Sequence, residues 1–122
     1  MKTTSLQLLP ATNQGSASGN YDGTATSFNG DAVKAAGYYS SRGTLQTVAF
    51  FTTDLLATIT IQATVDSTVT ESSWFDVHTV AGDGSSVTND NEVANLTGRY
   101  TWMRVKVTNF TQGVIDKVNV SY

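Results

Sequence analysis

The residues best suited to chemistry form an aromatic and basic row in the last third of the 122-residue chain. In the segment 100–107, YTWMRVKV, side chains alternate between two faces of a predicted strand, so Trp102, Arg104 and Lys106 lie on one face. An indole beside two cations can anchor a partner subunit, pair with carboxylates or stack on a sugar ring. The structural alternative is that a loop or second sheet covers Trp102, with the stems of Arg104 and Lys106 over its ring. We take Tyr100, Trp102, Arg104 and Lys106 as candidate interface or ligand-binding residues.

The chain has a single histidine, His78, which excludes any site that needs two imidazoles from the same chain. Asp76 lies two residues before it, and we expect both side chains on one face of a strand. Two ligands do not close a metal site, so we interpret the pair as exposed side chains on a solvated strand face. The serines lack the elbow motif of a serine hydrolase. The sequence therefore predicts no catalytic residue, no resident metal and no cofactor.

Oxygen ligands of the kind that calcium prefers crowd one loop: Asp83, Asn89, Asp90, Asn91 and Glu92. The EF-hand spacing fails here, because the glycine at its sixth position and its closing acid are missing. Turn-forming Asn and Asp account for the same residues. We interpret 82–91 as a polar, mobile loop between two strands, with calcium as the alternative.

The composition excludes several classes of protein. The chain has no cysteine, which rules out disulfide scaffolds, thiolate metal sites and cysteine nucleophiles. A net charge of −3 with only seven Lys plus Arg argues against a nucleic-acid surface. The apolar run at 6–9 is interrupted by Gln7 and stopped by Pro10, which is too short for an export signal or a membrane span. We expect a protein made and used without export, with no membrane partner.

The elements that must position these residues are strands. Thr, Val, Tyr and Phe abound, and period-two alternation is explicit in ATITIQATV, residues 57–65. The predicted strands are 5–9, 24–28, 32–39, 45–53, 57–65, 74–80, 92–96, 100–107 and 114–122, with 31–36 as a possible short helix. About eight or nine short strands separated by Gly, Asn, Asp and Ser predict an all-β, antiparallel, jelly-roll-like β-sandwich.

Domain organisation follows from the same pattern. Residues 1–20 read as an N-terminal arm with a first strand and a Gly/Ser-rich stretch, and residues 21–122 as the sandwich. Asp22-Gly23 and Asn29-Gly30 predict tight turns with positive φ. The core is expected to hold alternating residues on facing sheets: Ile59, Ile61, Val65, Met103, Val105 and Val107.

The C-terminal half carries a resemblance to a known family over residues 57–122. The strand pattern runs ATITIQATVDS, then WFDV, then GRYTWMRVKVTNFTQGVIDKVNVSY. It resembles small β-sandwich domains of tailed-bacteriophage virion proteins, with their "IQ-S/T" turn, "G-x-Y-x-W-hydrophobic-Arg" strand and closing "G-x-I-x-K-V" strand. It is also similar to galactose-binding-like (discoidin-type) jelly rolls, which share the strand order. The chain departs from discoidin modules in having no cysteine pair and no export signal.

The resemblance implies a non-enzymatic virion structural protein, in a head-decoration, neck or tail-associated position, assembled in the host cytoplasm. Its expected partners are virion proteins and further copies of itself. We expect a homo-oligomer because the arm at 3–10 could add a strand to the sheet edge of a neighbour. The alternative is a carbohydrate-binding module that recognises host surface polysaccharide through Trp102 or the loop tips.

Overall fold

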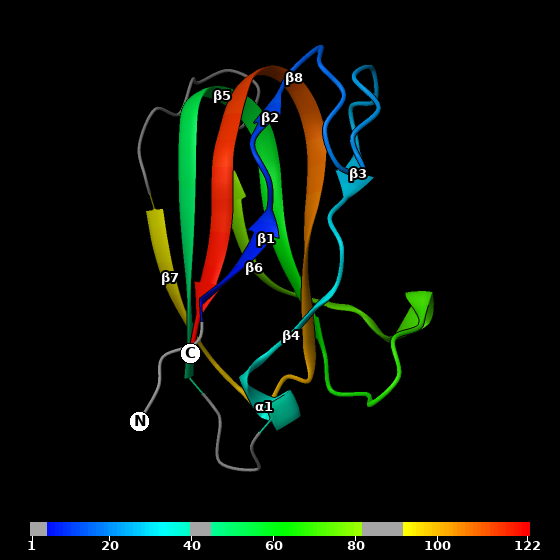
Figure 1. The fold of residues 1–122 in the computed structure, drawn as a ribbon, viewed down its shortest axis with the longest axis vertical. Helices are drawn as coiled ribbons and strands as arrows, with labels where there is room; N and C mark the ends of the chain where they lie inside the picture. The colour runs from blue at the N-terminus through cyan, green and yellow to red at the C-terminus, as the bar shows by residue number, and fades with distance from the viewer. Residues whose placement is uncertain (1–4, 40–44, 82–91) are drawn as a thin grey trace.

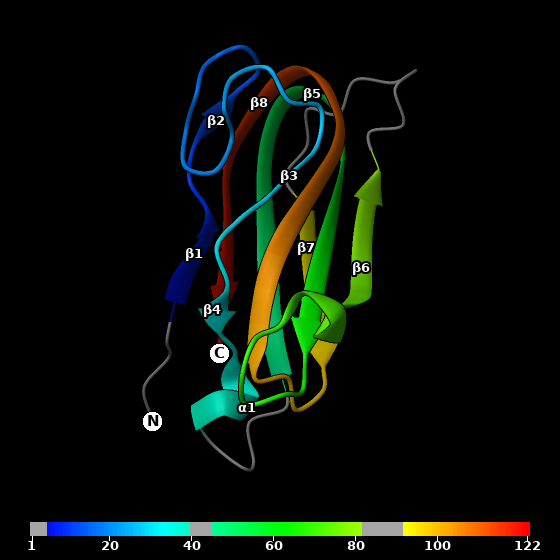
Figure 2. The same ribbon diagram turned by 90° about the vertical axis from the view of Figure 1, so that its right-hand side faces the viewer.

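The computed structural model describes residues 5–39, 45–81 and 92–122. These residues form one antiparallel sheet of eight strands that folds over into two layers and is nearly closed into a barrel (Figures 1 and 2). The elements are β1 (Ser5–Leu9), β2 (Thr12–Asn13), β3 (Phe28–Asn29), β4 (Val33–Lys34), α1 (Ala36–Tyr39), β5 (Leu45–Thr64), a 3-10 helix η1 (Glu71–Ser73), β6 (Phe75–Ala81), β7 (Glu92–Thr97) and β8 (Trp102–Ser121). The predicted all-β antiparallel sandwich is confirmed.

Two strands of twenty residues each, β5 and β8, belong to both layers. They pair with each other from Thr47–Ser121 to Thr64–Trp102. Register shifts around Leu56 mark the bend in β5, while Asn109 (φ 55°) and Gly113 (φ 95°) lie at the bend in β8. The sequence predicted two separate strands at each of these places. The structure joins each pair because bulges and left-handed residues let a strand turn a corner and pass between sheets.

The bend divides the sheet into two layers. The first layer consists of the N-terminal half of β5, the C-terminal half of β8, and β1, β2 and β7. The second layer consists of the other halves of β5 and β8, with β3, β4 and β6. Figure 1 shows β5 and β8 passing over the same end of the molecule.

The core lies between the layers. The alternation of the sequence correctly predicted most of the core residues that the second layer contributes. Ile59, Ile61, Met103, Val105 and Val107 are all fully buried. Their predicted placement on facing sheets was wrong, because Ile59 pairs with Val107 and Ile61 with Val105 within one layer. The first layer faces them with Val48, Phe50, Val118 and Val120. The predicted burial of Val65 was also wrong, because β5 ends at Thr64 and Val65 is 61% exposed.

The N-terminal segment is part of the sandwich in this structure. β1 pairs with β8 of its own chain, and Leu8 and Leu9 are each 2% exposed. The Gly/Ser-rich stretch is anchored by Tyr21, which is buried against Phe28 and Phe110 with ring centroids 5.1 and 5.2 Å away. The reason to expect that this segment reaches a neighbour is therefore weaker, because β1 already adds a strand to the sheet of its own chain.

Two local predictions had different outcomes. Gly23 has φ 93°, as the Asp22-Gly23 turn requires, and the Asp22 carboxylate accepts hydrogen bonds from the N–H groups of Thr24 and Ala25. The predicted Asn29-Gly30 turn was wrong. Gly30 lacks a positive φ, and its N–H donates to the Val105 carbonyl at 2.7 Å, so the segment runs along β8.

Helical structure is confined to short pieces. The predicted strand 32–39 is instead the two-residue β4 followed by the four-residue α1, so the helix occupies the last four residues of the predicted strand. Within the described residues, no helix has the length and apolar character needed to cross a membrane.

Candidate functional site

The predicted row on β8 lies on the outer face of the second layer, and the chain itself covers much of it. Trp102 is half-buried and packs edge-on against Tyr38 of α1, with ring centroids 5.4 Å apart. Its Nε1 points to the Ser67 carbonyl at 3.4 Å. The Lys34 ammonium lies 4.5 Å from the Tyr38 ring centre and 5.9 Å from that of Trp102. Tyr38 is the more accessible of the two rings, at 41% exposed.

Tyr100 lies just before β8 and is half-buried against the core. Its carbonyl accepts a hydrogen bond from the N–H of Gly37 at 2.9 Å. A Cβ at Gly37 would come within 2.7 Å of the Tyr100 carbonyl oxygen, so this close approach requires glycine. Tyr100 thus ties α1 to the start of β8, and its side chain is not on the open surface.

Arg104 is the most enclosed member of the row, with its side chain only 11% exposed. Its Nε donates to Gln62 Oε1 at 2.8 Å, and its terminal nitrogens lie 3.3 and 3.5 Å from the Glu71 carboxylate. The ring of Trp74 covers the guanidinium at 4.5 Å. The connection between β5 and β6 therefore folds over this side chain and takes it away from solvent.

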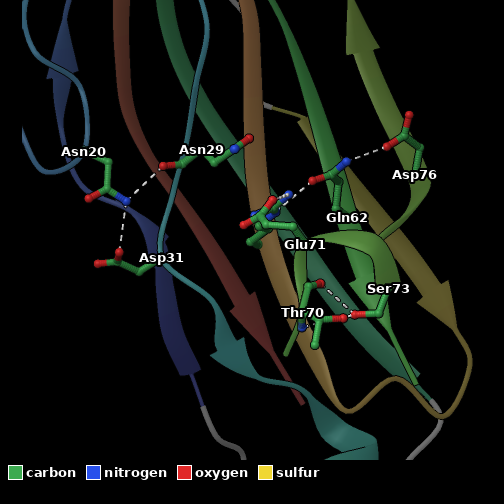
Figure 3. Close-up of polar contacts among 9 residues, drawn as sticks. Asn20, Asn29, Asp31, Gln62, Thr70, Glu71, Ser73 and Asp76 are labelled. Atoms are coloured by element: carbon green, nitrogen blue, oxygen red, sulfur yellow. Dashed lines mark hydrogen bonds and ion pairs between the residues drawn. The ribbon is translucent and has the colours of Figure 1, made fainter. Parts of the chain in front are cut away.

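A polar relay continues from Arg104 to the edge strand. Gln62 Nε2 donates to Asp76 Oδ1 at 2.9 Å, so one amide joins the guanidinium to a carboxylate (Figure 3). Glu71 is 84% exposed, and its ion pair with Arg104 is therefore the weakest part of this network. The indole Nε1 of Trp74 is buried with no hydrogen-bond partner among the described residues.

Lys106 completes the row as a half-buried side chain between Thr60 of β5 and Asn29 of β3. The structure thus places Trp102, Arg104 and Lys106 on one outer face, as alternation predicts. Trp102, however, already packs against Tyr38, and Arg104 already contacts Glu71 and Trp74. The covering connection has no periodic pattern, so the sequence carried no signal for it.

The predicted pair Asp76 and His78 does not share a face. Ile61 pairs with His78 and Gln62 with Asp76, which leaves Val77 as an extra residue in β6. This bulge reverses the alternation. Asp76 consequently reaches Gln62 on the outer face, whereas the His78 ring stacks on the buried Phe50 at 6.0 Å.

The described residues contain no group of three or more His, Asp or Glu side chains that could hold a metal. The candidate calcium loop falls mostly on 82–91, outside the residues that the structure describes.

Sequence reasoning missed the outer face of the first layer. This face, called the open face here, presents side chains that are exposed or half-exposed: Ser5, Gln7, Leu45, Thr47, Ala49, Phe51, Val93, Asn95, Thr97, Lys117, Asn119 and Ser121. Leu45 and Val93 are 57% and 64% exposed. The Lys117 ammonium lies over the Phe51 ring at 4.9 Å, near the bend. The alternation of LQTVAFFT, residues 45–52, was the signal that could have found this face.

No protein-family model matches the chain, and no curated protein sequence matches it closely enough to count as a relative.

Proposed function

We propose that this chain is a non-enzymatic structural protein of a tailed-phage virion, in a head-decoration, neck or tail-associated position, that acts through protein–protein contacts. The observation that carries the proposal is the open face. It is a regular sheet surface of Thr, Asn, Ser and Gln with exposed Leu45 and Val93. Because few charged groups would lose their hydration, such a surface can pack against another protein at low cost.

The resemblance of residues 57–122 to phage virion sandwiches supplies the class of assembly. The partners in this proposal are other virion proteins and further copies of the chain, brought together in the host cytoplasm. The face with Trp102, Arg104 and Lys106 serves the fold more than the contact, since Tyr38 already packs on Trp102 and Trp74 covers Arg104.

The test is attachment of purified protein to phage particles that lack it. Asn119→Arg places a charge in the middle of the open face, and we expect at least about tenfold weaker attachment, because a charge buried at a contact loses its hydration. Ser72→Arg is the matched control, because Ser72 is exposed on the connection that covers the second layer. Equal attachment of both variants would move the contact elsewhere, and absence of the chain from purified virions would overturn the virion role.

A carbohydrate-binding module is the second candidate, and one cluster favours it. Tyr38 and Trp102 form an aromatic pair beside the Lys34 ammonium, and the accessible Tyr38 ring could stack on a sugar. Tyr38→Ala should then abolish binding to host polysaccharide on a glycan array, while the variant stays folded and its solution mass is unchanged. If the unmodified protein binds no glycan at millimolar concentration, this candidate fails.

A further inference from the structure

We infer that β7 is a self-pairing edge: two copies of the chain join their β7 strands antiparallel across a two-fold axis and continue the first layer from one copy into the next. This deepens the proposed function, on which it rests for its setting, by naming a second copy as one partner. A sandwich leaves the edges of its sheets unpaired, and an unpaired edge strand presents free N–H and C=O groups to any matching strand.

Three of the four edges in the described part of the chain are blunted. β1 contains a bulge at Leu8 and is followed by Pro10. β6 contains the bulge at Val77 and carries Asp76. The remaining second-layer edge is made of β3 and β4, which are two residues long. Bulges, proline, charge and short length are the devices that keep edges from pairing.

β7 carries only one of these devices, the charge of Glu92 at its first residue. It pairs with β5 in unbroken register from Leu45–Thr97 to Phe50–Glu92, and in the described residues β5 is its one strand partner. Residues 93–97 read VANLT and contain no charged residue and no proline. Val93 is 64% exposed on this strand, and Figure 1 shows β7 at the outer edge of the molecule.

The sequence of β7 also fits a two-fold axis. An axis through Asn95 would set Asn95 opposite its own copy, Val93 opposite Thr97, and Ala94 opposite Leu96. Identical strands meet there without like charges facing each other, whereas like charges directly opposite would destabilise the pair. On the outer face, Val93 of the second copy would enter the cross-strand row that already contains Thr97 and Leu45, which is 57% exposed.

Asn95 is preorganised for this position. Its Oδ1 accepts a hydrogen bond from Thr47 Oγ1 at 2.8 Å, which fixes the amide on the outer face. Asn95→Asp keeps this acceptor and the size of the side chain, so the fold should be retained. In the dimer the same change sets two carboxylates opposite each other.

The experiment measures solution mass by light scattering and sedimentation for four variants of the full chain. We expect the unmodified protein to reach twice the 13.0 kDa of one chain as its concentration rises. Asn95→Asp and Asn95→Lys should each raise the dimer dissociation constant about fivefold or more. An equimolar mixture of these two variants should regain the dimer, because opposite charges then meet across the axis.

Ser72→Asp and Ser72→Lys are the matched controls. Ser72 is exposed in η1, on the connection that covers the second layer, and lies outside the open face, so neither change should alter the mass. A monomeric unmodified protein at all concentrations would overturn the inference and leave attachment to virions untouched. If the unmodified protein dimerises but the Asn95 variants, folded by circular dichroism, keep its mass, the self-contact lies elsewhere. A mixture that stays monomeric would refute the pairing through Asn95.

Discussion

Replacing Arg104 by alanine is expected to destabilise the isolated chain. The change removes the 2.8 Å hydrogen bond to Gln62, the stacking under Trp74 and the long ion pair to Glu71. A hydrogen bond involving a charged group contributes about 1.5–3 kcal/mol, and a partly buried cation–π contact about 1 kcal/mol. The ion pair adds at most about 0.5 kcal/mol, because Glu71 is 84% exposed. Since these contributions overlap, we expect a loss of about 2–4 kcal/mol in the free energy of unfolding.

Urea denaturation followed by tryptophan fluorescence measures this loss, and Trp74 provides a probe that touches the altered site. The transition midpoint should fall while the slope stays unchanged, because the same surface is exposed on unfolding. Lys106→Ala is the matched control. Lys106 is two residues along the same strand face, and its side chain makes no hydrogen bond or ion pair within the described residues, so its loss should stay within about 0.5 kcal/mol.

A different result would refute the reasoning. If Arg104→Ala loses less than about 1 kcal/mol and instead abolishes attachment to a partner, then Arg104 acts at an interface and the cover formed by Trp74 and Glu71 opens in the assembly. Glu71→Gln separates the two contributions, because it removes the ion pair and leaves the Gln62 and Trp74 contacts in place.

Three further predictions concern the core and one turn. Ile61→Ala should lower the free energy of unfolding by about 2–4 kcal/mol through lost burial and a cavity, measured by urea denaturation; a near-neutral change would contradict its place in the core. Tyr21→Phe should cost about 0.5–1.5 kcal/mol in the same assay, because its hydroxyl accepts the Gly15 N–H at 3.0 Å; no change would show that this bond is replaced by water. A hydrogen bond from the Thr24 N–H, which has the largest effect, and a second from the Ala25 N–H hold the pKa of Asp22 below its ordinary 3.8. Its stabilising effect should thus be complete above that value and disappear as the pH falls through the lowered pKa; an NMR titration of Asp22 checks this, and an unshifted midpoint would contradict the turn.

The sequence predicted those parts of the fold that depend on one strand at a time. Alternation placed Ile59 and Ile61 in the core, and it placed Arg104 and Lys106 together on the opposite face. The Asp-Gly turn at 22–23 was found for the same reason, since a positive φ is a local requirement. Such features need no knowledge of what lies across the sheet.

Features that depend on a distant partner were missed. The bulge at Val77 is defined by pairing with Ile61 and Gln62, so alternation within β6 alone put His78 on the wrong face. The burial of Arg104 depends on Trp74, which lies in a connection without periodicity. The open face consists mainly of small polar side chains, so no aromatic or charged motif marks it in the sequence.

The passage of β5 and β8 through both layers has a consequence for how the chain folds. Neither layer can form on its own, because the same two strands supply the centre of each. A single long pairing, which joins segments as distant in the sequence as Thr47 and Ser121, builds both layers together. Native contacts of this range are slow to form, and we expect refolding in milliseconds to seconds. Hydrogen exchange should accordingly show β5 and β8 opening in one cooperative step, with η1 and β2 exchanging sooner.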